Sequence, residues 1–223
     1  MRSMRKVWLA TTAATAALIP AALPAPASAA TACVAGSTSS YVALGSGGCT
    51  VGPLTFYDFS VATLGNATLN SPNVTVSTSI PGEFGLSLNF STIIPSENTD
   101  VNWGFDVSGA SITDAYVSVT GGGSNGGLVS LSEGLQNSGG STFETINLSG
   151  TGSISTTVIF SSEPTVIVSK DQTDFANGGT ASSSVLTDDF SVATPIPGTL
   201  ALFASGLVGL FGLRRKRKPQ AIA

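Results

Sequence analysis

Carboxylate side chains come closest to forming a chemical site in this chain. Asp171, Asp174 and Asn177 lie together in KDQTDFANGG, and their oxygens are the hard ligands that Ca²⁺ prefers. Their spacing matches neither an EF-hand loop nor a glycine-rich β-roll repeat. Asp and Asn also favour such loops by hydrogen bonding to their own backbone, so a calcium site and a plain loop both stay open. We assign no metal ion and no cofactor.

Other acidic residues have the type required for glycoside hydrolysis, which needs two carboxylates at a set separation. The residues concerned are Glu83, Glu97, Asp100 and Asp106. The sequence does not give their separation. Trp103 and Tyr116 would stack on a sugar ring if they were exposed, but their positions in strand-like segments favour a core role.

Histidine is absent from the chain, and this excludes Ser-His-Asp catalysis, Cys-His catalysis and histidine metal sites. Lys170 would be needed for a Ser-Lys pair, but no motif surrounds it. The run GGGSNGG, residues 121–127, lacks the Lys-Ser/Thr end of a P-loop and is predicted to be a turn. We therefore predict that the protein is not an enzyme and assign no catalytic residue.

The N-terminus has the features of a secretory signal peptide in the usual order. The basic residues at its start are Arg2, Arg5 and Lys6. An apolar segment, residues 7–19, follows and is too short to span a bilayer comfortably. A Pro- and Ala-rich exit then offers small residues at Ala27 and Ala29, and we predict cleavage after Ala29. Residues 1–29 are thus assigned to a signal peptide, and the protein is predicted to be exported.

Export makes a disulfide the expected state of the two cysteines, Cys33 and Cys49. Closing a loop of this size would stabilise the fold by about 3 kcal/mol on the chain-entropy estimate. A lipid-modified Cys33 is the alternative. The preceding ATA lacks the leucine usual at such sites, and Cys33 lies far beyond the apolar segment.

The body of the chain, residues 30–194, is strongly acidic. It carries one lysine against 13 acidic residues, a net charge of −12. Such a body repels nucleic-acid phosphates and anionic membrane surfaces, so we predict no nucleic-acid partner. The charge either attracts divalent cations or basic partners, or simply keeps a secreted domain soluble.

The same body alternates short strand-like runs with Gly, Pro, Asn and Ser, and no segment in it has a convincing helical period. In GLSLNF, for example, Leu86, Leu88 and Phe90 share one face. About ten strands are expected, with YVALG (residues 41–45) among them. We predict an all-β fold in which residues 30–194 form one antiparallel β-sandwich of jelly-roll or immunoglobulin-like type. An N-terminal signal helix and a single C-terminal transmembrane helix are expected to flank it.

The C-terminus joins a short apolar span to a basic run. As a helix, residues 199–213 would be about 22 Å long, against a hydrocarbon core of about 30 Å. Counted from Pro195 the helix reaches about 28 Å, which is adequate and suits temporary retention. The basic residues, which favour the cytoplasmic side and place the body outside, are Arg214, Arg215, Lys216, Arg217 and Lys218. Residues 219–223 would form a cytoplasmic tail.

Residues 195–218, PIPGTLALFASGLVGLFGLRRKRK, resemble the PEP-CTERM sorting signal, in which a short motif, a transmembrane helix and a basic stop follow one another. The residues that fit the motif are Pro195, Pro197, Gly198, Thr199 and Leu200. Ile196 stands where the family usually has glutamate. The body also resembles a set of exported proteins with this tail, in GGCTVGPLTFYDFSV and VSKDQTDFANGG.

This resemblance implies export, a halt in the inner membrane, and cleavage near residues 195–197 by an exosortase-type membrane enzyme. The body would then remain at the cell surface or outside the cell. The implied partners are signal peptidase, the exosortase-type enzyme and, until processing, the membrane. Proteins with this tail are associated with bacteria that build polysaccharide matrices, so an exopolysaccharide partner stays open.

Two main hypotheses for function follow. The first is a non-enzymatic surface or extracellular-matrix protein, processed at its C-terminal signal. The second is a secreted carbohydrate-binding or carbohydrate-active protein, which would present Trp103 or Tyr116 on a concave face beside paired acids. A third, a body permanently anchored by an uncut tail, differs from the first only in its processing.

Overall fold

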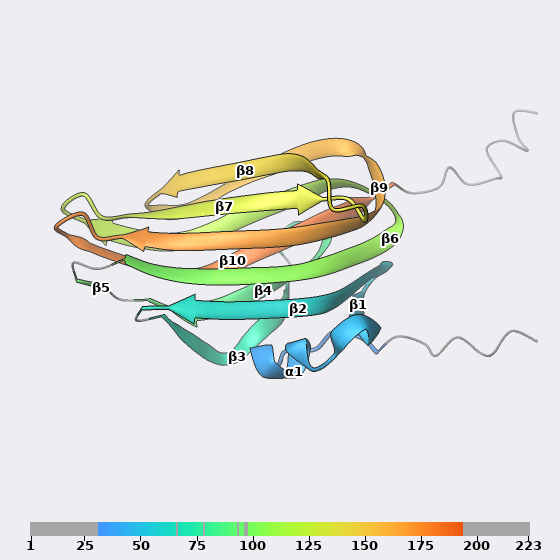
Figure 1. Ribbon diagram of the computed structural model, residues 1–223, viewed down its shortest axis with the longest axis horizontal. Helices are drawn as coiled ribbons and strands as arrows, with labels where there is room; N and C mark the ends of the chain where they lie inside the picture. The colour runs from blue at the N-terminus through green and yellow to red at the C-terminus, as the bar shows by residue number, and fades with distance from the viewer. Residues whose placement is uncertain (1–30, 66, 78, 93, 96–97, 194–223) are drawn as a thin grey trace, which may run out of the picture.

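The computed structural model describes residues 31–65, 67–77, 79–92, 94–95 and 98–193 (Figure 1). The predicted signal peptide, residues 1–29, and the predicted sorting signal, residues 195–218, lie outside the described residues. Both flanking helices and their roles therefore stay predictions. Within the described part of the chain, no helix is long and apolar enough to cross a membrane.

Strands dominate the described residues, and every pairing between named strands is antiparallel, as predicted. The helices are α1 (Thr38–Val42) and the short 3₁₀ helix η1 (Gly45–Gly47). The strands are β1 (Cys49–Val51), β2 (Leu54–Leu64), β3 (Thr68–Ser77), β4 (Phe84–Ser91), β5 (Ile94–Pro95), β6 (Asn98–Ser124), β7 (Leu128–Gln136), β8 (Thr142–Gly150), β9 (Gly152–Phe175) and β10 (Thr180–Val192).

Two long strands, β6 and β9, each take part in both layers of a sandwich. Their shared register is interrupted between Ser108 and Ile112, where both strands curve round one end of the molecule (Figure 1). In the first layer, residues 98–108 of β6 pair with β2 and with the end of β9, which is followed by β7 and β8. In the second layer, residues 112–124 of β6 pair with β10 and the start of β9, and β4 and β3 continue the sheet beyond β10.

Apolar side chains alternate along the strands and fill the space between the two layers. The predicted inward face of β4 is confirmed, because Leu86, Leu88 and Phe90 are wholly buried. Trp103 on β6 is 1% exposed and packs on Phe105, with ring centroids 5.0 Å apart. The core role expected of Trp103 is therefore confirmed, whereas the core role expected of Tyr116 is wrong, because Tyr116 lies half-buried on the outer face of β6. The sandwich arrangement agrees with the predicted fold class.

The segment YVALG was predicted to be a strand, and this prediction is wrong: it falls in α1, in the turn that follows and at the start of η1. Ser37 caps the helix, its Oγ accepting a hydrogen bond from the Ser40 amide over 3.1 Å. Tyr41 packs edge-on against Phe59, with ring centroids 5.0 Å apart, and its hydroxyl donates to the Val34 carbonyl over 2.8 Å. A helix cap and a buried aromatic anchor thus override the local strand propensity.

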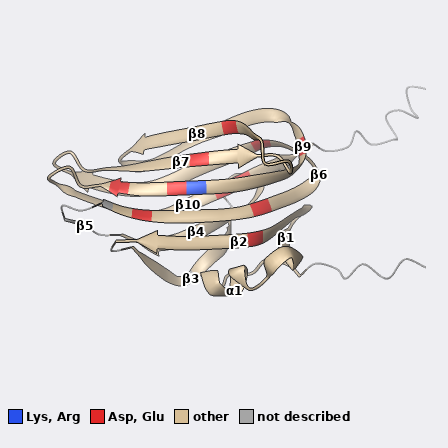
Figure 2. Ribbon diagram, viewed as in Figure 1, with Lys and Arg blue, Asp and Glu red and all other residues tan. Residues whose placement is uncertain are grey.

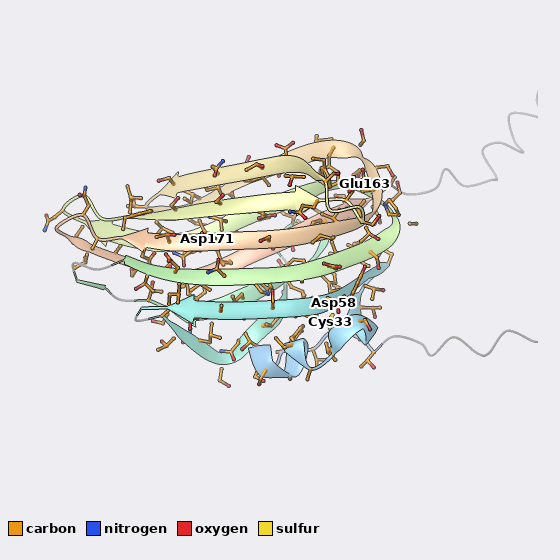
Figure 3. The ribbon with its side chains drawn as sticks, in the orientation of Figure 1. Cys33, Asp58, Glu163 and Asp171 are labelled. Atoms are coloured by element: carbon orange, nitrogen blue, oxygen red, sulfur yellow. A yellow bond between two sulfur atoms is a disulfide. The ribbon has the colours of Figure 1, made fainter. Side chains whose placement is uncertain are left out.

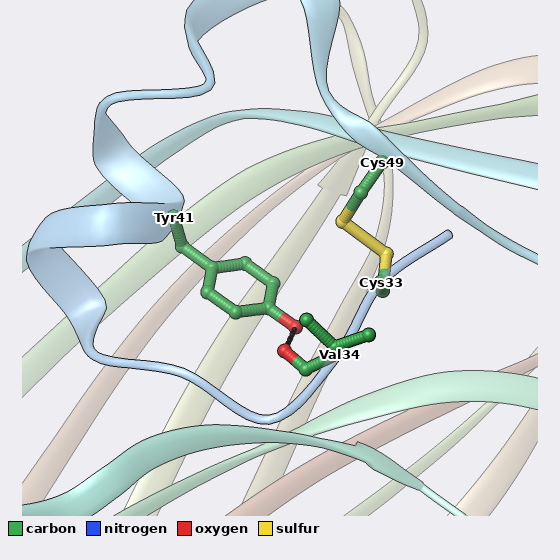
Figure 4. The surroundings of a disulfide bond; sticks show 4 residues. All are labelled: Cys33, Val34, Tyr41 and Cys49. Atoms are coloured by element: carbon green, nitrogen blue, oxygen red, sulfur yellow. Dashed lines mark hydrogen bonds between the residues drawn. A yellow bond between two sulfur atoms is a disulfide. The ribbon is translucent and has the colours of Figure 1, made fainter. Parts of the chain in front are cut away.

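A disulfide joins Cys33 and Cys49, as predicted, with a Cα–Cα distance of 4.9 Å. It ties the segment that precedes α1 to β1, close to the hydrogen bond between Tyr41 and Val34 (Figure 4). This pairing favours the disulfide over a lipid-modified Cys33.

Candidate functional site

The described strands carry a single basic residue, Lys170 on β9 (Figure 2), and its side chain is buried between the two layers. Alternation along β9 places Lys170 on the same face as Val166 and Val168, both of which belong to the core. The Lys170 side chain is 0% exposed. Because lysine is almost never fully buried without partners, its surroundings decide what this residue does.

Two carboxylates meet the Lys170 ammonium inside the sandwich. Glu133 on β7 lies directly opposite Lys170 in the β7–β9 register, and its Oε2 accepts a hydrogen bond from Lys170 Nζ. Asp188 comes from β10 in the other layer, and its Oδ1 lies 2.5 Å from Nζ. All three side chains are fully buried. We call Glu133, Lys170 and Asp188 the interior ionic cluster, and it joins the two layers.

The walls around this cluster are apolar. Trp103 stands opposite Lys170 in the β6–β9 register and is nearly fully buried. Asp188 lies between Leu86 of β4 and Val117 of β6 in the register of the second layer, and both are wholly buried. Since bulk water is excluded, the charges of the cluster interact with one another far more strongly than they would at the surface.

Burial and mutual charge shift the pKa values of the cluster. Burial raises the pKa of Asp188 well above its ordinary value, and the nearby Glu133 carboxylate raises it further. Burial also raises the pKa of Glu133, against the opposing effect of Lys170. For Lys170, burial lowers the pKa, but Asp188 and Glu133 raise it, and the net direction is upward. Two carboxyl groups therefore compete for one buried ammonium.

A second buried carboxylate, Asp174, lies further along the same face of β9. Its Oδ2 accepts hydrogen bonds from the hydroxyls of Thr92 and Ser183, the latter over 3.1 Å, and its Oδ1 accepts from Gln172 Nε2 over 2.9 Å. Burial raises the pKa of Asp174, whereas these three hydrogen bonds lower it and the charge of Asp100 raises it. The net direction is upward. Hydrogen bonds from side chains, rather than a cation, therefore satisfy this carboxylate.

The structure does not bring together the residues considered for calcium. Asp174 is buried inside the sandwich, whereas Asp171 points to the opposite face of β9 and is exposed. Asn177 lies in the exposed turn after β9, with a positive φ of 43°. Among the residues that the structure describes, no group of three or more His, Cys, Asp or Glu side chains is placed to hold a metal ion.

The acids considered for a glycosidase pair are also separated. Asp100 and Asp106 share the outer face of β6, six positions apart, so about 20 Å separates them along an extended strand. Glycosidase carboxylates stand only about 5 to 9.5 Å apart. Glu83 precedes β4 in the other layer, and Glu97 lies outside the described residues. The described candidates thus do not form the glycosidase pair that was considered from the sequence.

The outer faces of the sandwich carry most of the remaining acids, in small groups of like charge. Burial, and then the charge of Asp58, raise the pKa of Asp106 on the neighbouring strand. Burial, and then the charge of Asp100, raise the pKa of Asp171; Asp58 and Asp171 are labelled in Figure 3. Acids spread in this way over both layers agree with the solubility role considered from the sequence.

Lys170 was considered as a candidate from the sequence, whereas Glu133 and Asp188 were not. A signal was present in the strand alternation, which places Glu133 of VSLSEGL in line with leucines of the core. In VLTDDF the same alternation places Asp188 between Leu186 and Phe190, both wholly buried. A charged residue at an inward position of an apolar strand therefore marks each missed member of the cluster.

No protein-family model matches the chain, and no curated protein matches it either. Among solved structures, the carbohydrate-binding module TmCBM61 in complex with β-1,4-galactotriose is 15% identical to this chain. The match covers 61% of this chain and 88% of the module, with a TM-score of 0.32. The mannan-recognising module TmCBM27 is 14% identical, and the match covers 65% of this chain and 98% of the module, with a TM-score of 0.29. An isomalto-dextranase of Arthrobacter globiformis T6 is 11% identical, and the match covers 61% of this chain and 23% of the enzyme, with a TM-score of 0.30. Similarity at this level carries no inference about function.

Proposed function

We propose that the protein is an exported, non-enzymatic structural protein of the cell surface or extracellular matrix. A signal peptide would deliver it, and an exosortase-type enzyme would process it at residues 195–218. One observation carries the proposal: the side chains of Glu133, Lys170 and Asp188, the groups of the body best suited to acid–base chemistry, are 0% exposed.

Acid–base catalysis needs a side chain within hydrogen-bonding reach of a bound substrate. The interior ionic cluster reaches only its own members and apolar walls such as Trp103, Leu86 and Val117. Its position between the layers suits a role in holding them together. A contact that stabilises the two layers against separation suits a structural domain displayed outside the cell.

The sequence of the tail supports the sorting part of the proposal. Strand β10 ends at Val192, three residues before the motif begins at Pro195. The last strand that the structure describes therefore ends before the motif, the apolar span and the basic stop begin. Cleavage near residues 195–197 would release every strand that the structure describes.

Fractionation of the producing cells tests this proposal. The basic stop, Arg214 to Lys218, is replaced by serine and glutamine, and a variant that carries serine only at Gln220 and Ala221 serves as the control. We expect the parent and the control to reach the cell surface or the medium, whereas the variant without the basic stop should be mislocalised. A body that stays in the cytoplasm in all three, with residues 1–29 attached, would overturn the proposal.

A carbohydrate-binding protein is the second candidate, and one observation favours it. Tyr116 lies on the outer face of β6, half-buried, opposite Asp189 of β10. Burial, and then the charges of Asp114 and Asp189, raise the pKa of Glu83, so acids lie close together near this tyrosine. Soluble oligosaccharides should then bind the purified body and should cease to bind when Tyr116→Ala is introduced. Binding that does not change in Tyr116→Ala, or no binding at all, rejects this candidate.

A further inference from the structure

The interior ionic cluster is unusual because three ionisable side chains are fully buried together. It places three ionisable groups, two of one sign, where water cannot solvate them, and desolvating an ion is costly. Oxygens are left without hydrogen-bond partners, namely Glu133 Oε1 and Asp188 Oδ2. A reaction that removed one charge of each sign would leave one ionisable group buried there instead of three.

The fold holds an amine and a carboxyl group in contact for such a reaction. Lys170 Nζ lies 2.5 Å from Asp188 Oδ1, and each residue is fixed by a strand deep in its own layer. Reactive groups held in this way reach effective concentrations of about 10⁵–10⁸ M in favourable cases. The apolar walls also leave no bulk water to reverse a condensation.

We propose that Lys170 and Asp188 condense into an intramolecular amide bond that links the two layers, with Glu133 as the group that transfers the proton. One proton of the Lys170 ammonium first passes to the Asp188 carboxylate. The neutral amine then attacks Cγ of Asp188, so that a C–N bond forms and the bond from Cγ to the protonated carboxyl oxygen breaks. Glu133 accepts a proton from Nζ and delivers it to the departing oxygen, which leaves as water. The ammonium and carboxylate together contain the atoms of one amide and one water molecule, so no oxidant, reductant or co-reactant is required.

Geometry favours Asp188 over Glu133 as the partner of Lys170. The two layers of a sandwich lie about 10 Å apart, a gap that an extended lysine meeting a short aspartate can cross. Glu133 instead stands directly opposite Lys170 on the adjacent strand, where Cβ atoms are only about 5 Å apart. An amide between these two long side chains would have to buckle. Glu133 is therefore placed to move protons, and Asp188 to be the acylated group.

The amide would fasten β10, the last strand of the body, to β9. Lys170 is inward on β9 and Asp188 is inward on β10, and the two strands are not hydrogen-bonded neighbours in a sheet. A force applied to the C-terminal end of β10 would then be borne by a covalent bond as well as by backbone hydrogen bonds. This inference goes beyond the proposed function, because the amide forms or fails to form however residues 195–218 are processed.

Trypsin tests the proposal with one cut. Between Lys6 and Arg214 the chain contains a single Lys or Arg, Lys170. The full-length protein is unfolded in urea, reduced, alkylated and digested, and the fragments are separated by size and weighed. An amide on Nζ makes Lys170 unrecognisable to trypsin, so we expect residues 7–214 to remain in one piece, lighter than its sequence by one water molecule.

A matched pair of variants isolates the part played by Glu133. Glu133→Gln and Glu144→Gln have the same mass, and Glu144 lies on β8 outside the cluster. We expect Glu133→Gln to be cut at Lys170 and to be heavier than Glu144→Gln by one water molecule. Asp188→Ala should also be cut. Digestion after glutamate should place the missing water in a fragment that holds Lys170 and Asp188 but lacks Glu133.

The parent protein alone decides the matter, even if a variant fails to fold. Complete cutting of the unfolded parent at Lys170, with the full mass of the sequence, would show that the cluster is only an ion pair and would overturn the proposal. A cross-link that joins Lys170 to the fragment containing Glu133 would overturn the assignment of Asp188. A Glu133→Gln protein that is protected from trypsin as fully as the parent would overturn the role of Glu133.

Discussion

Lys170 and Asp188 belong to opposite layers of the sandwich, yet Nζ of one lies 2.5 Å from Oδ1 of the other in the middle of an apolar core. Glu133 completes the contact from the layer that holds Lys170. The ion pair between Lys170 and Asp188 is therefore internal and connects β9 with β10. The cluster is therefore placed to stabilise the packing of the two layers and is not exposed at a surface where ligands could bind.

Removing the lysine should destabilise the body severely. Lys170→Met preserves length and packing but leaves Glu133 and Asp188 buried together without a cation. Leaving buried charges unpaired in this way costs about 3–5 kcal/mol, and we expect a loss of at least this size in the free energy of unfolding, because the variant also cannot form the proposed amide. Urea unfolding followed by circular dichroism measures it. Asp171→Asn, on the exposed face of the same strand, is the control and should change stability little. A loss in Lys170→Met no larger than in this control would show that the cluster does not hold the layers together.

Stability should rise as the pH falls from neutral towards the ordinary carboxyl range. The pKa of Asp174 is raised by burial, and so is the pKa of Asp189, despite hydrogen bonds that lower both. A raised pKa means that the folded chain binds the proton more tightly than the unfolded chain. The stabilisation is then complete below the ordinary value of 3.8 and is lost as the pH rises through the raised pKa.

Urea unfolding at about pH 5 and about pH 8 measures this effect, and the midpoint should be higher at the lower pH. Asp174→Asn cannot ionise at this position and should reduce the difference between the two midpoints. Glu144→Gln on β8 is the control and should leave the difference unchanged. A body that is equally stable at both pH values, or more stable at the higher pH, would contradict the assigned pKa directions.

The disulfide should contribute substantially to the stability of the N-terminal part of the body. Cys33 and Cys49 are 16 positions apart, and closing a loop of this length stabilises a fold by about 3 kcal/mol in the chain-entropy model. The variant Cys33→Ser/Cys49→Ser should lose about this much free energy of unfolding and should therefore unfold at a lower urea concentration. Adding reductant should leave the urea midpoint of this variant unchanged. A parent protein whose midpoint is equally insensitive to reductant would show that the disulfide is absent or contributes nothing.

Trp103 offers an optical test of the core. The chain has two tryptophans, and Trp8 lies in the predicted signal peptide, so the mature body would contain Trp103 alone. Because Trp103 is nearly fully buried, we expect blue-shifted fluorescence that iodide does not quench and oligosaccharides do not change. Unfolding in urea should shift the emission to longer wavelength. A spectral change on adding an oligosaccharide to the folded body would instead place Trp103 at an accessible site and favour the carbohydrate-binding candidate.

Strand alternation made much of the fold predictable. Leu86, Leu88 and Phe90 were assigned to one face from the sequence, and all three are wholly buried. Helix α1 was missed because its signals are an N-cap at Ser37 and the packing of Tyr41, which a search for long helical periods does not detect. Strands β6 and β9 each bend along their length, and the bend interrupts the alternation from which one long strand would be predicted.

The candidate site was less predictable than the fold. Glu133 and Asp188 are far apart in the sequence, and only the curvature of β6 and β9 brings the strands that carry them face to face. Their inward register was readable from the alternation, but their meeting at Lys170 depends on which strands oppose one another across the core. Conversely, Asp171 and Asp174 are close in sequence yet point to opposite faces of β9.

The proposal of an exported and processed structural protein is tested most directly by the two ends of the native protein. The protein is recovered from the surface or medium of cells that produce it, and its terminal peptides are identified by mass spectrometry. We predict a chain that begins at Ala30 and ends between Pro195 and Pro197. A recovered protein that still carries Arg214 to Lys218, or that retains residues 1–29, would contradict it.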